Sequence, residues 1–448
     1  MKTEKVLSKY FVTATTEDKS LLLFNCKTSK THKISGKYQR DFDKIMNRKP
    51  MGISSEVKAF LDERQYLVDS INEEYLDIEY QFLKIVNSRE RLRLTILPTN
   101  ACNFKCIYCC QDGPYTNMND IDAIKIIKFI KRIGLEYKSI YISWFGGEPL
   151  LGIKRIEQIS DELMKFSKLN KKPYLAEITT NGYLLTTETF KRLLDCKVIF
   201  YQITIDGTNE THNKNRPHCT NNNSYEQIYK NLLKIKQNFK NNYFRIILRI
   251  NITPEISQQL ETILSKFSQD FGDDSRFVFA VQPVRDWGGQ RIQEHKDGLI
   301  NELDYYSERM ELFNKLKLKL WDMNFFNFGS TFCDANYKHA YIINPKGELL
   351  RCSIAEYNKE YKKVNHVGVI NDVGDAILNQ NDKLWRERQE KESCKECCVY
   401  PLCCRATCKL GFNITKNENT CKKYEMIQYL QLFLKNRDVR EEIDEELY

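Results

Sequence analysis

From about residue 91 onward, apolar residues recur in two alternating patterns. Short runs with strand character are separated by longer segments, such as residues 122–133 and 224–239, in which apolar side chains return at helical spacing. Six alternations of strand and helix predict a parallel sheet with helices outside it, and right-handed crossovers curl such a sheet into a full or partial barrel. The predicted strands cover residues 91–97, 139–145, 175–179, 198–205, 244–252 and 276–282.

The first 85 residues follow a different pattern, in which short strand-like runs precede two short helical segments and a final apolar run. We predict a small winged-helix domain, joined to the barrel by a charged stretch around residues 72–90. A packing or oligomerisation appendage is the alternative to a peptide-recognition domain. The strand-like runs are 5–14, 20–25 and 31–35, the helical segments are 39–47 and 54–63, and the apolar run is 66–68.

The composition changes after a helical run that ends near Trp321. Residues 333–421 carry nine of the 16 cysteines and few long periodic segments, which predicts a small domain held by metal rather than by an apolar core. An amphipathic helix at 424–436 is interpreted as packing. The predicted domains are 1–85 (winged helix), 86–322 (barrel) and 323–448 (cysteine-rich).

The composition of the chain argues against several classes of protein and favours metal ligation by cysteine. No signal peptide or long apolar run is present, so we expect a cytoplasmic protein that does not enter a membrane. A reducing compartment disfavours a disulfide framework and favours metal ligation. The net charge of +9 is spread along the chain, which argues against a nucleic-acid partner. Only six histidines occur, so polar hydrolysis is a poor candidate.

Cys102, Cys106 and Cys109 form a C-x3-C-x2-C motif directly after the first predicted strand. Loops at the carboxyl ends of barrel strands are where chemistry collects. A structural zinc ion takes four protein ligands, whereas three thiolates on an iron–sulfur cubane leave one iron open to another ligand. Cys110 is an extra thiol beside the third cysteine, and we interpret it as a bystander.

With an aromatic residue, Tyr108, before its last cysteine, this motif resembles the signature of the radical S-adenosylmethionine (SAM) superfamily. The resemblance implies a [4Fe-4S] cluster whose open iron binds S-adenosylmethionine. Reductive cleavage of that cofactor then yields a 5′-deoxyadenosyl radical, while the protein binds, orients and excludes water. It also places Tyr108 against the adenine.

Two further loops resemble the same family. The Gly-Gly-Glu sequence at Gly146, Gly147 and Glu148 implies a loop that receives the methionine amino group. The segment 204–218 implies contacts from Thr204 to the ribose and from Arg216 to the methionine carboxylate.

The C-terminal cysteines resemble the SPASM extension of this superfamily, which binds two auxiliary [4Fe-4S] clusters. Alone, the C-x2-C at Cys394 and Cys397 would indicate zinc. The resemblance assigns three cysteines to the first auxiliary cluster and four to the second, with Cys398 and Cys404 as rival ligands. The first set is Cys333, Cys352 and Cys408; the second is Cys394, Cys397, Cys403 and Cys421.

Together these features resemble maturases of ribosomally made peptides, of the sactipeptide, ranthipeptide or cyclophane type, with a PqqD-like leader-recognition domain. The resemblance implies three [4Fe-4S] clusters, S-adenosylmethionine, a flavodoxin or ferredoxin as electron donor, and a precursor peptide whose leader joins the N-terminal domain as a strand. The expected outcome is a thioether, C–C or C–O crosslink, and the general base is not identified. The alternatives are a formylglycine-generating anaerobic sulfatase maturase and a zinc-stabilised binding protein without catalysis.

Overall fold

A computed structural model describes most of the chain. Within the described part, no helix has the length and apolar character needed to cross a bilayer. The predicted domain boundary at residue 322 and the helix end near Trp321 lie outside the described residues. Those residues are 4–111, 115–286, 290–294, 299, 302–316, 318, 326–357, 360–388, 391–415, 421–439 and 443–447.

The six strands predicted from residue 91 onward are all present and form the parallel part of a ten-stranded sheet. The order is β11-β10-β9-β8-β7-β6, so each strand pairs with its neighbour in sequence. The α/β fold and its parallel sheet are therefore confirmed. The strands are β6 (Arg91–Ile96), β7 (Ser139–Trp144), β8 (Tyr174–Thr180), β9 (Val198–Thr204), β10 (Arg245–Ile252) and β11 (Phe277–Pro283).

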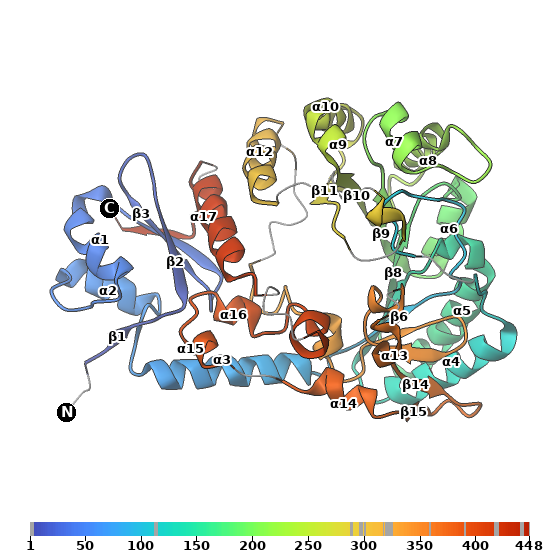
Figure 1. Ribbon diagram of the computed structural model, residues 1–448, viewed down its shortest axis with the longest axis horizontal. Helices are drawn as coiled ribbons and strands as arrows, with labels where there is room; N and C mark the ends of the chain where they lie inside the picture. The colour runs from blue at the N-terminus through green and yellow to red at the C-terminus, as the bar shows by residue number, and fades with distance from the viewer. Residues whose placement is uncertain are drawn as a thin grey trace.

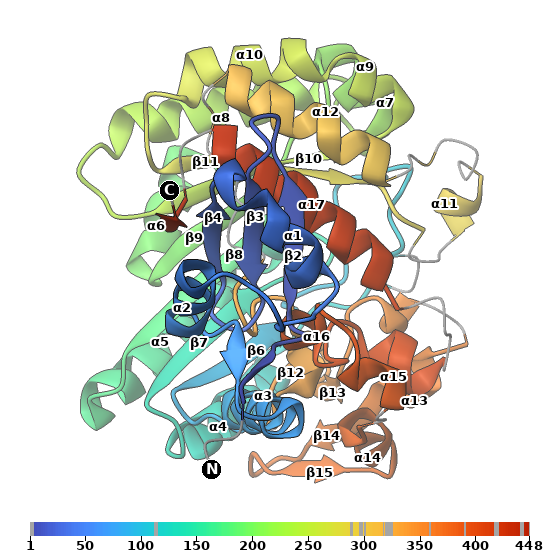
Figure 2. The same ribbon diagram turned by 90° about the vertical axis from the view of Figure 1, so that its left-hand side faces the viewer.

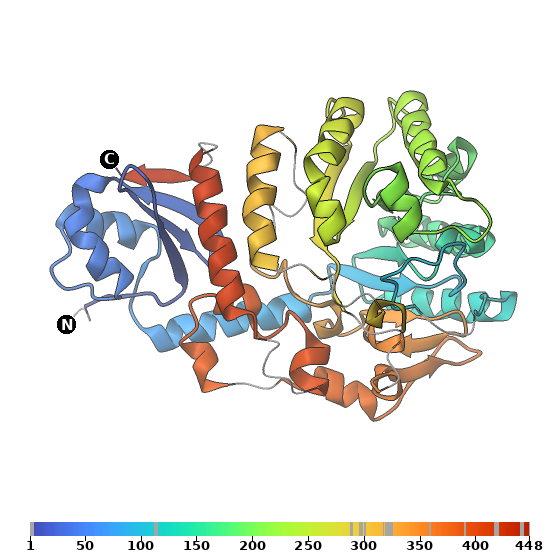
Figure 3. The same ribbon diagram turned by 45° about the horizontal axis from the view of Figure 1, so that its top comes forward.

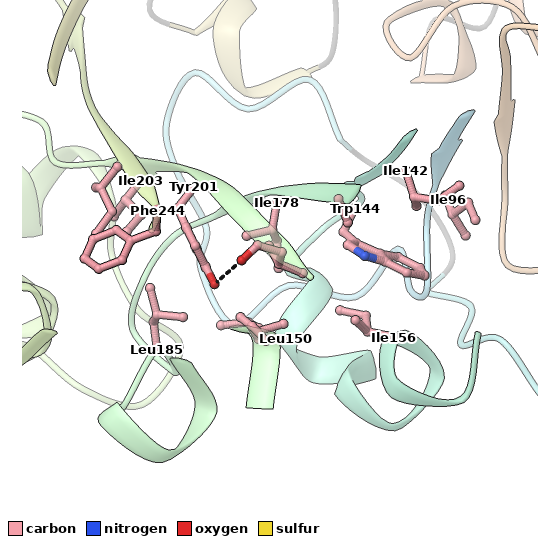
Figure 4. Packing of buried hydrophobic residues seen from close by; sticks show 14 of the residues in the cluster. Ile96, Ile142, Trp144, Leu150, Ile156, Ile178, Leu185, Tyr201, Ile203 and Phe244 are labelled. Atoms are coloured by element: carbon pink, nitrogen blue, oxygen red, sulfur yellow. Dashed lines mark hydrogen bonds between the residues drawn. The ribbon is translucent and has the colours of Figure 1, made fainter. Parts of the chain in front are cut away.

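Alternating side chains of these strands face two environments. Leu94, Ile142 and Trp144 are buried in the main apolar core beneath the helices, as Figure 4 shows for Ile142 and Trp144. Their neighbours Arg93 and Tyr141 point to the other face, where they line a cavity. The period of two along each strand thus separates an apolar outer face from a polar interior.

Helices cover the outer face of the sheet (Figures 1 and 2). Several begin at a capping side chain: Asn119 accepts a hydrogen bond from the amide of Asp122, and Thr186 accepts one from the amide of Thr189. The helices that follow β6 to β11 along the chain are α4 (Asp120–Gly134), α5 (Ile153–Asn170), α6 (Thr187–Asp195), α7 (Asn209–Asn215), α8 (Ser224–Asn238), α9 (Pro254–Gln258), α10 (Leu260–Phe271), α11 (Gln290–Gln293) and α12 (Glu302–Lys315), of which α11 lies to one side of the sheet in Figure 2.

The N-terminal strands and helices lie where the sequence predicts them. A four-stranded sheet of order β16-β4-β3-β2 packs one face on α1 and α2, and β1 pairs with β5. The elements are β1 (Val6–Leu7), β2 (Phe11–Thr15), β3 (Leu21–Asn25), β4 (Lys30–Ile34), α1 (Gln39–Met46), α2 (Ser55–Glu63) and β5 (Leu67–Val68), joined at the sheet edge by β16 (Glu445–Leu447) from the C-terminus.

The charged stretch around 72–90, expected to be a connection, is largely a helix, α3 (Ile71–Val86). Its apolar face packs against the cysteine-rich segment, and Arg388 donates a hydrogen bond of 2.7 Å to Glu79. The last helix, α17 (Lys423–Val439), packs on the second face of the N-terminal sheet through Leu430 and Leu434, as expected for a packing helix (Figure 3). The N-terminal sheet therefore lies between α1 and α2 on one side and α17 on the other.

The cysteine-rich segment continues the main sheet. β12 pairs in parallel with β6 and antiparallel with β13, and the hairpin turn is closed by the Gly347 amide, which donates to the Asn344 carbonyl at 3.0 Å. Short helices follow. The elements are β12 (Tyr341–Ile343), β13 (Glu348–Leu350), α13 (Lys362–Asn365), β14 (His366–Ile370), β15 (Ala376–Leu378), α14 (Asn381–Arg386), α15 (Glu392–Lys395) and α16 (Tyr400–Cys403).

Candidate functional site

The first cysteine loop follows β6 directly and is held by backbone contacts. The amides of Lys105 and Ile107 donate to the carbonyls of Pro217 and Asn215, at 2.9 and 3.0 Å. The loop therefore lies along the segment that carries Arg216. This pairing brings together two motifs that are about 100 residues apart in the sequence.

Three thiols gather in this loop, and their burial disfavours the charged thiolate form. Cys106 is buried, while Cys102 and Cys109 are partly buried. Burial raises the pKa of Cys102 to about 12, with further contributions from Glu148 and the other two cysteines, and burial raises the pKa of Cys106 to about 11. Since metal ligation requires thiolates, bound iron would supply the positive charge that stabilises them. The donor set fits a cluster held by three cysteines.

Gly146 and Gly147 let two loops of the barrel touch backbone to backbone. The amide of Gly147 donates to Thr99 at 3.2 Å, and that of Glu148 donates to Ala101 at 2.8 Å. A Cβ atom on Gly146 would overlap the Thr99 carbonyl, and one on Gly147 would overlap the Ala101 carbonyl. Gly146 also has φ +123°, a conformation that favours glycine. Both glycines thus allow the loop after β7 to lie directly against the backbone that leads into the cysteine loop.

Replacing Gly147 with alanine is expected to destabilise the fold by about 2–3 kcal/mol, because the new methyl group meets fixed backbone atoms. The displaced cysteine loop should also lower the iron content. Thermal unfolding and iron analysis of the anaerobically purified variant measure both effects. Gly134→Ala is the matched control, since its new methyl group would meet only the flexible side chains of Ile140 and Phe166. An equal loss in both variants would contradict this role for Gly147.

Glu148 is fully enclosed and fixes the neighbouring loop. Its carboxylate accepts hydrogen bonds from the Thr180 hydroxyl at 2.7 Å, the Asn181 amide at 2.7 Å and the Leu150 amide at 3.0 Å. Burial raises the pKa of this carboxyl although these donors favour its charged form. It contributes to the pKa shift of Cys102, so the two lie close together. The predicted contact between Glu148 and an ammonium group remains a prediction.

Tyr108 belongs to a buried polar network at the same end of the barrel. Its hydroxyl donates to Asp206 and accepts from Arg216 at 2.6 Å and from Asn251 at 3.2 Å. Asp206 is fully buried and pairs with Arg216 at 3.6 Å. The network fixes the tyrosine directly beside the third cysteine. Thr204, at the end of β9, is 8% exposed.

The sequence reasoning missed Asp206 and Asn251 as members of this network. The Asp-Gly pair at 206–207 is typical of an ordinary turn, so it does not by itself indicate a site residue. Asn251 lies inside β10 and carried no signal at all. His212 has a structural place: its Nδ1 atom accepts the Asp206 amide at 3.1 Å, and burial lowers its pKa well below the usual value.

All seven predicted auxiliary cysteines line one cavity of about 1130 Å³. Side chains from the barrel interior line the same cavity, including Arg93, Tyr141 and Glu177. The Tyr141 hydroxyl donates to Glu177 at 2.6 Å. The cysteines are Cys333, Cys352, Cys394, Cys397, Cys403, Cys408 and Cys421.

The pKa shifts of two of these cysteines indicate neighbours from their own predicted sets. Burial raises the pKa of Cys333 to about 12, and Cys352 and Cys408 add to that shift. Burial also raises the pKa of Cys403, with contributions from Cys394 and Cys421. For Cys397, burial raises the pKa to about 12, and both Cys398 and Cys403 contribute. The division into two sets therefore stays a prediction.

The rival ligands lie elsewhere. Cys404 is 1% exposed and its thiol donates to the Pro401 carbonyl at 3.6 Å. Cys398, like its neighbour Cys397, packs against the apolar cluster beneath the N-terminal sheet that contains Cys26. Neither is among the described residues that line the cavity. Within the described ranges, no three His, Cys, Asp or Glu side chains converge as ligands of a single ion would.

Known proteins resemble this chain in sequence and fold. The profile of the Radical SAM superfamily matches residues 96–263. A cysteine-type anaerobic sulfatase-maturating enzyme of Clostridium perfringens (strain 13 / Type A) is 22% identical over 335 residues, which cover 70% of this chain and 87% of that protein. The radical SAM cyclopropyl synthase TigE of Paramaledivibacter caminithermalis is 26% identical over 275 residues, covering 54% and 56% of the two chains.

A solved structure shares the fold. Native anSMEcpe with bound AdoMet and Kp18Cys peptide superposes with a TM-score of 0.59 at 18% identity, covering 79% of this chain and all of that one. The matched residues 96–263 begin in β6 and include the cysteine loop, the Gly-Gly-Glu turn and the Tyr108 network. Residues 96–263 therefore carry a radical SAM domain, and the relatives that align with this part of the chain are enzymes.

Proposed function

We propose that this enzyme is a peptide maturase that oxidatively crosslinks a ribosomally made precursor. The observation that carries the proposal is the cavity of about 1130 Å³, bounded by barrel side chains and by all seven auxiliary cysteines. Pockets for drug-sized ligands are about 300–1,000 Å³, so the cavity has room for a peptide segment. When bound, a reduced [4Fe-4S] cluster and S-adenosylmethionine supply a radical that abstracts a hydrogen atom.

The protein's own residues would bind and orient these groups. Cys102, Cys106 and Cys109 would hold the catalytic cluster, while the network around Tyr108 would fix one side of the nucleotide site. The seven cavity cysteines would hold two auxiliary clusters, for three in all, with a flavodoxin or ferredoxin as electron donor in the cytoplasm. Auxiliary clusters beside the substrate cavity would accept the electron that crosslinking releases.

The N-terminal unit would recruit the precursor. Its sheet and helices have the predicted order, and strand addition to a sheet edge is a common way to grip an extended peptide. Holding the leader there raises the local concentration of the core peptide at the cavity. The unit also touches the cysteine-rich segment, because the Tyr10 hydroxyl donates to the Lys395 carbonyl at 3.0 Å.

Anaerobic sulfatase maturation is the second candidate, because the Clostridium perfringens relative and the anSMEcpe structure favour it. Against it stands the part of this chain that has no counterpart in that structure, since the superposition covers all of anSMEcpe but only 79% of this chain. Zinc-stabilised binding without catalysis is less well supported, because residues 96–263 match the Radical SAM superfamily and the aligned relatives are enzymes.

Mass spectrometry of a coexpressed precursor separates the enzyme candidates. The small open reading frame beside this gene is the first precursor to test. Crosslinking should make the peptide lighter by two hydrogen atoms, whereas formylglycine formation from a cysteine replaces sulfur with oxygen and also removes two hydrogen atoms. An unchanged precursor together with a modified sulfatase peptide would overturn the proposal. Zinc in a colourless protein would overturn both enzyme candidates.

A further inference from the structure

The C-terminal strand β16 covers one edge of the N-terminal sheet. It pairs in parallel with β4, with Glu445 opposite His32 and Leu447 opposite Ile34. The Ser35 amide donates to the Leu447 carbonyl at 2.8 Å, and the Asp444 amide donates to the Thr31 carbonyl at 3.0 Å. The dark red strand marked C lies against the blue sheet in Figures 1 and 3. A segment more than 400 residues away in sequence thus completes this sheet.

The edge at β4 is suited to accept a strand, whereas the edge at β2 is engaged by side chains. On β2, the Phe11 carbonyl accepts from Arg48 at 2.8 Å and the Thr13 carbonyl accepts from Gln431 at 3.1 Å. On β4, the partner is the backbone of β16. An uncovered edge strand presents unpaired N–H and C=O groups to any extended chain.

Two anchors define the chemistry of a segment that fits this edge. Glu445 forms an ion pair with Arg64, whose side chain is only 17% exposed. Leu447 packs against the apolar cluster formed with α1 and α2. More positive charge lies nearby, because Arg437 pairs with Asp444 at 3.3 Å. The edge therefore fits an extended, acidic peptide with an apolar residue two positions after a carboxylate.

Strand β16 is short enough for another strand to replace it at the β4 edge. All three residues of β16 are only partly buried, and ion pairs between partly exposed side chains contribute little, about 0–1 kcal/mol each. Its attachment to α17 gives it a high effective concentration at the edge. A tethered but weak strand hinders a competitor without blocking it permanently.

We propose that β16 is an intramolecular competitor of the precursor leader and that it occupies the β4 edge until an acidic extended segment displaces it. The proposal rests on the peptide-maturase function proposed above. It adds the competing segment of this chain and the chemistry of the peptide that replaces it. The partner is thus a peptide strand that resembles the enzyme's own C-terminus.

A labelled peptide with the sequence of residues 440–448 tests the proposal by fluorescence polarisation. The enzyme truncated after Val439 should bind it, and the full-length enzyme should bind it at least about tenfold more weakly, since its site is mostly filled. Arg64→Ala in the truncated enzyme should weaken binding, whereas Arg40→Ala, at an exposed position on α1, should not. A peptide with Leu447→Asp should fail to bind.

The full-length variant Leu447→Asp provides a second route, because it loosens the tail without shortening the chain. It should gain binding of the wild-type peptide even if the truncated enzyme does not fold. Absence of binding in both variants would overturn the proposal, as would equal binding by the unaltered enzyme. The assay involves no catalysis, so its failure would leave the peptide-maturase function standing. A bindable edge in an enzyme that modifies no peptide would contradict that function instead.

Discussion

An enzyme with alanine at Cys102, Cys106 and Cys109 is expected to form no 5′-deoxyadenosine above the rate measured without enzyme. These three thiols gather after β6 and would bind three irons of a cluster. The fourth iron would have no protein ligand and would be free to bind the cofactor. Without the cluster, no electron reaches the sulfonium. Chromatography of reactions with dithionite and S-adenosylmethionine measures this loss, and iron content should fall by about four from about twelve.

Cys110→Ala is the matched control for this variant, because it removes a thiol from the same loop without removing a predicted ligand. Its iron content and 5′-deoxyadenosine formation should match those of the unaltered enzyme. Undiminished cleavage by the triple variant would contradict the assignment of the catalytic cluster. Loss of cleavage in Cys110→Ala would instead add that thiol to the site.

The neighbouring residues Cys403 and Cys404 are expected to respond in opposite ways to alanine substitution. Cys403 lines the cavity with the other auxiliary cysteines, whereas Cys404 is buried and donates to a backbone carbonyl. Cys403→Ala should lose about four irons and all crosslinked product while it still cleaves S-adenosylmethionine. Cys404→Ala should keep its iron and lose only about 1 kcal/mol of stability from a small cavity.

These variants are compared by three measurements: iron and sulfide analysis for the clusters, thermal unfolding for stability, and peptide mass spectrometry for the crosslinked product. The pair Cys397 and Cys398 offers the same comparison, since only Cys397 lines the cavity. The reverse pattern, with iron lost from Cys404→Ala and retained by Cys403→Ala, would mean that the ligand register is shifted by one residue. Retention of all iron in each single variant would contradict auxiliary clusters at these positions.

Much of the fold follows from local patterns in the sequence. The six parallel strands were predictable because short runs of strand character, some of them alternating between apolar and polar residues as in β6, lie between helical segments. Helix α3 was missed as a helix, although Tyr75, Ile78 and Phe82 have helical spacing and face the cysteine-rich segment. The charged residues between these apolar positions made the helical spacing hard to recognise in the sequence.

Long-range pairing could not be predicted in the same way. Strand β16 consists of two glutamates and a leucine, a sequence with no strand preference, and it forms because β4 supplies its hydrogen-bond partners. The pairing of β12 with β6 likewise depends on tertiary contacts. In the site, spacing identified the cysteines but not Asp206 and Asn251, because one buried aspartate or asparagine has no periodic pattern.

The ladder between β6 and β12 limits how the two cysteine-bearing regions can move. Tyr341, Ile342 and Ile343 pair with successive residues of β6, so the hairpin that leads to Cys352 is an extension of the barrel wall. A hinge between these regions would have to break those hydrogen bonds. Electron-tunnelling distances between clusters held there would therefore be set when the chain folds.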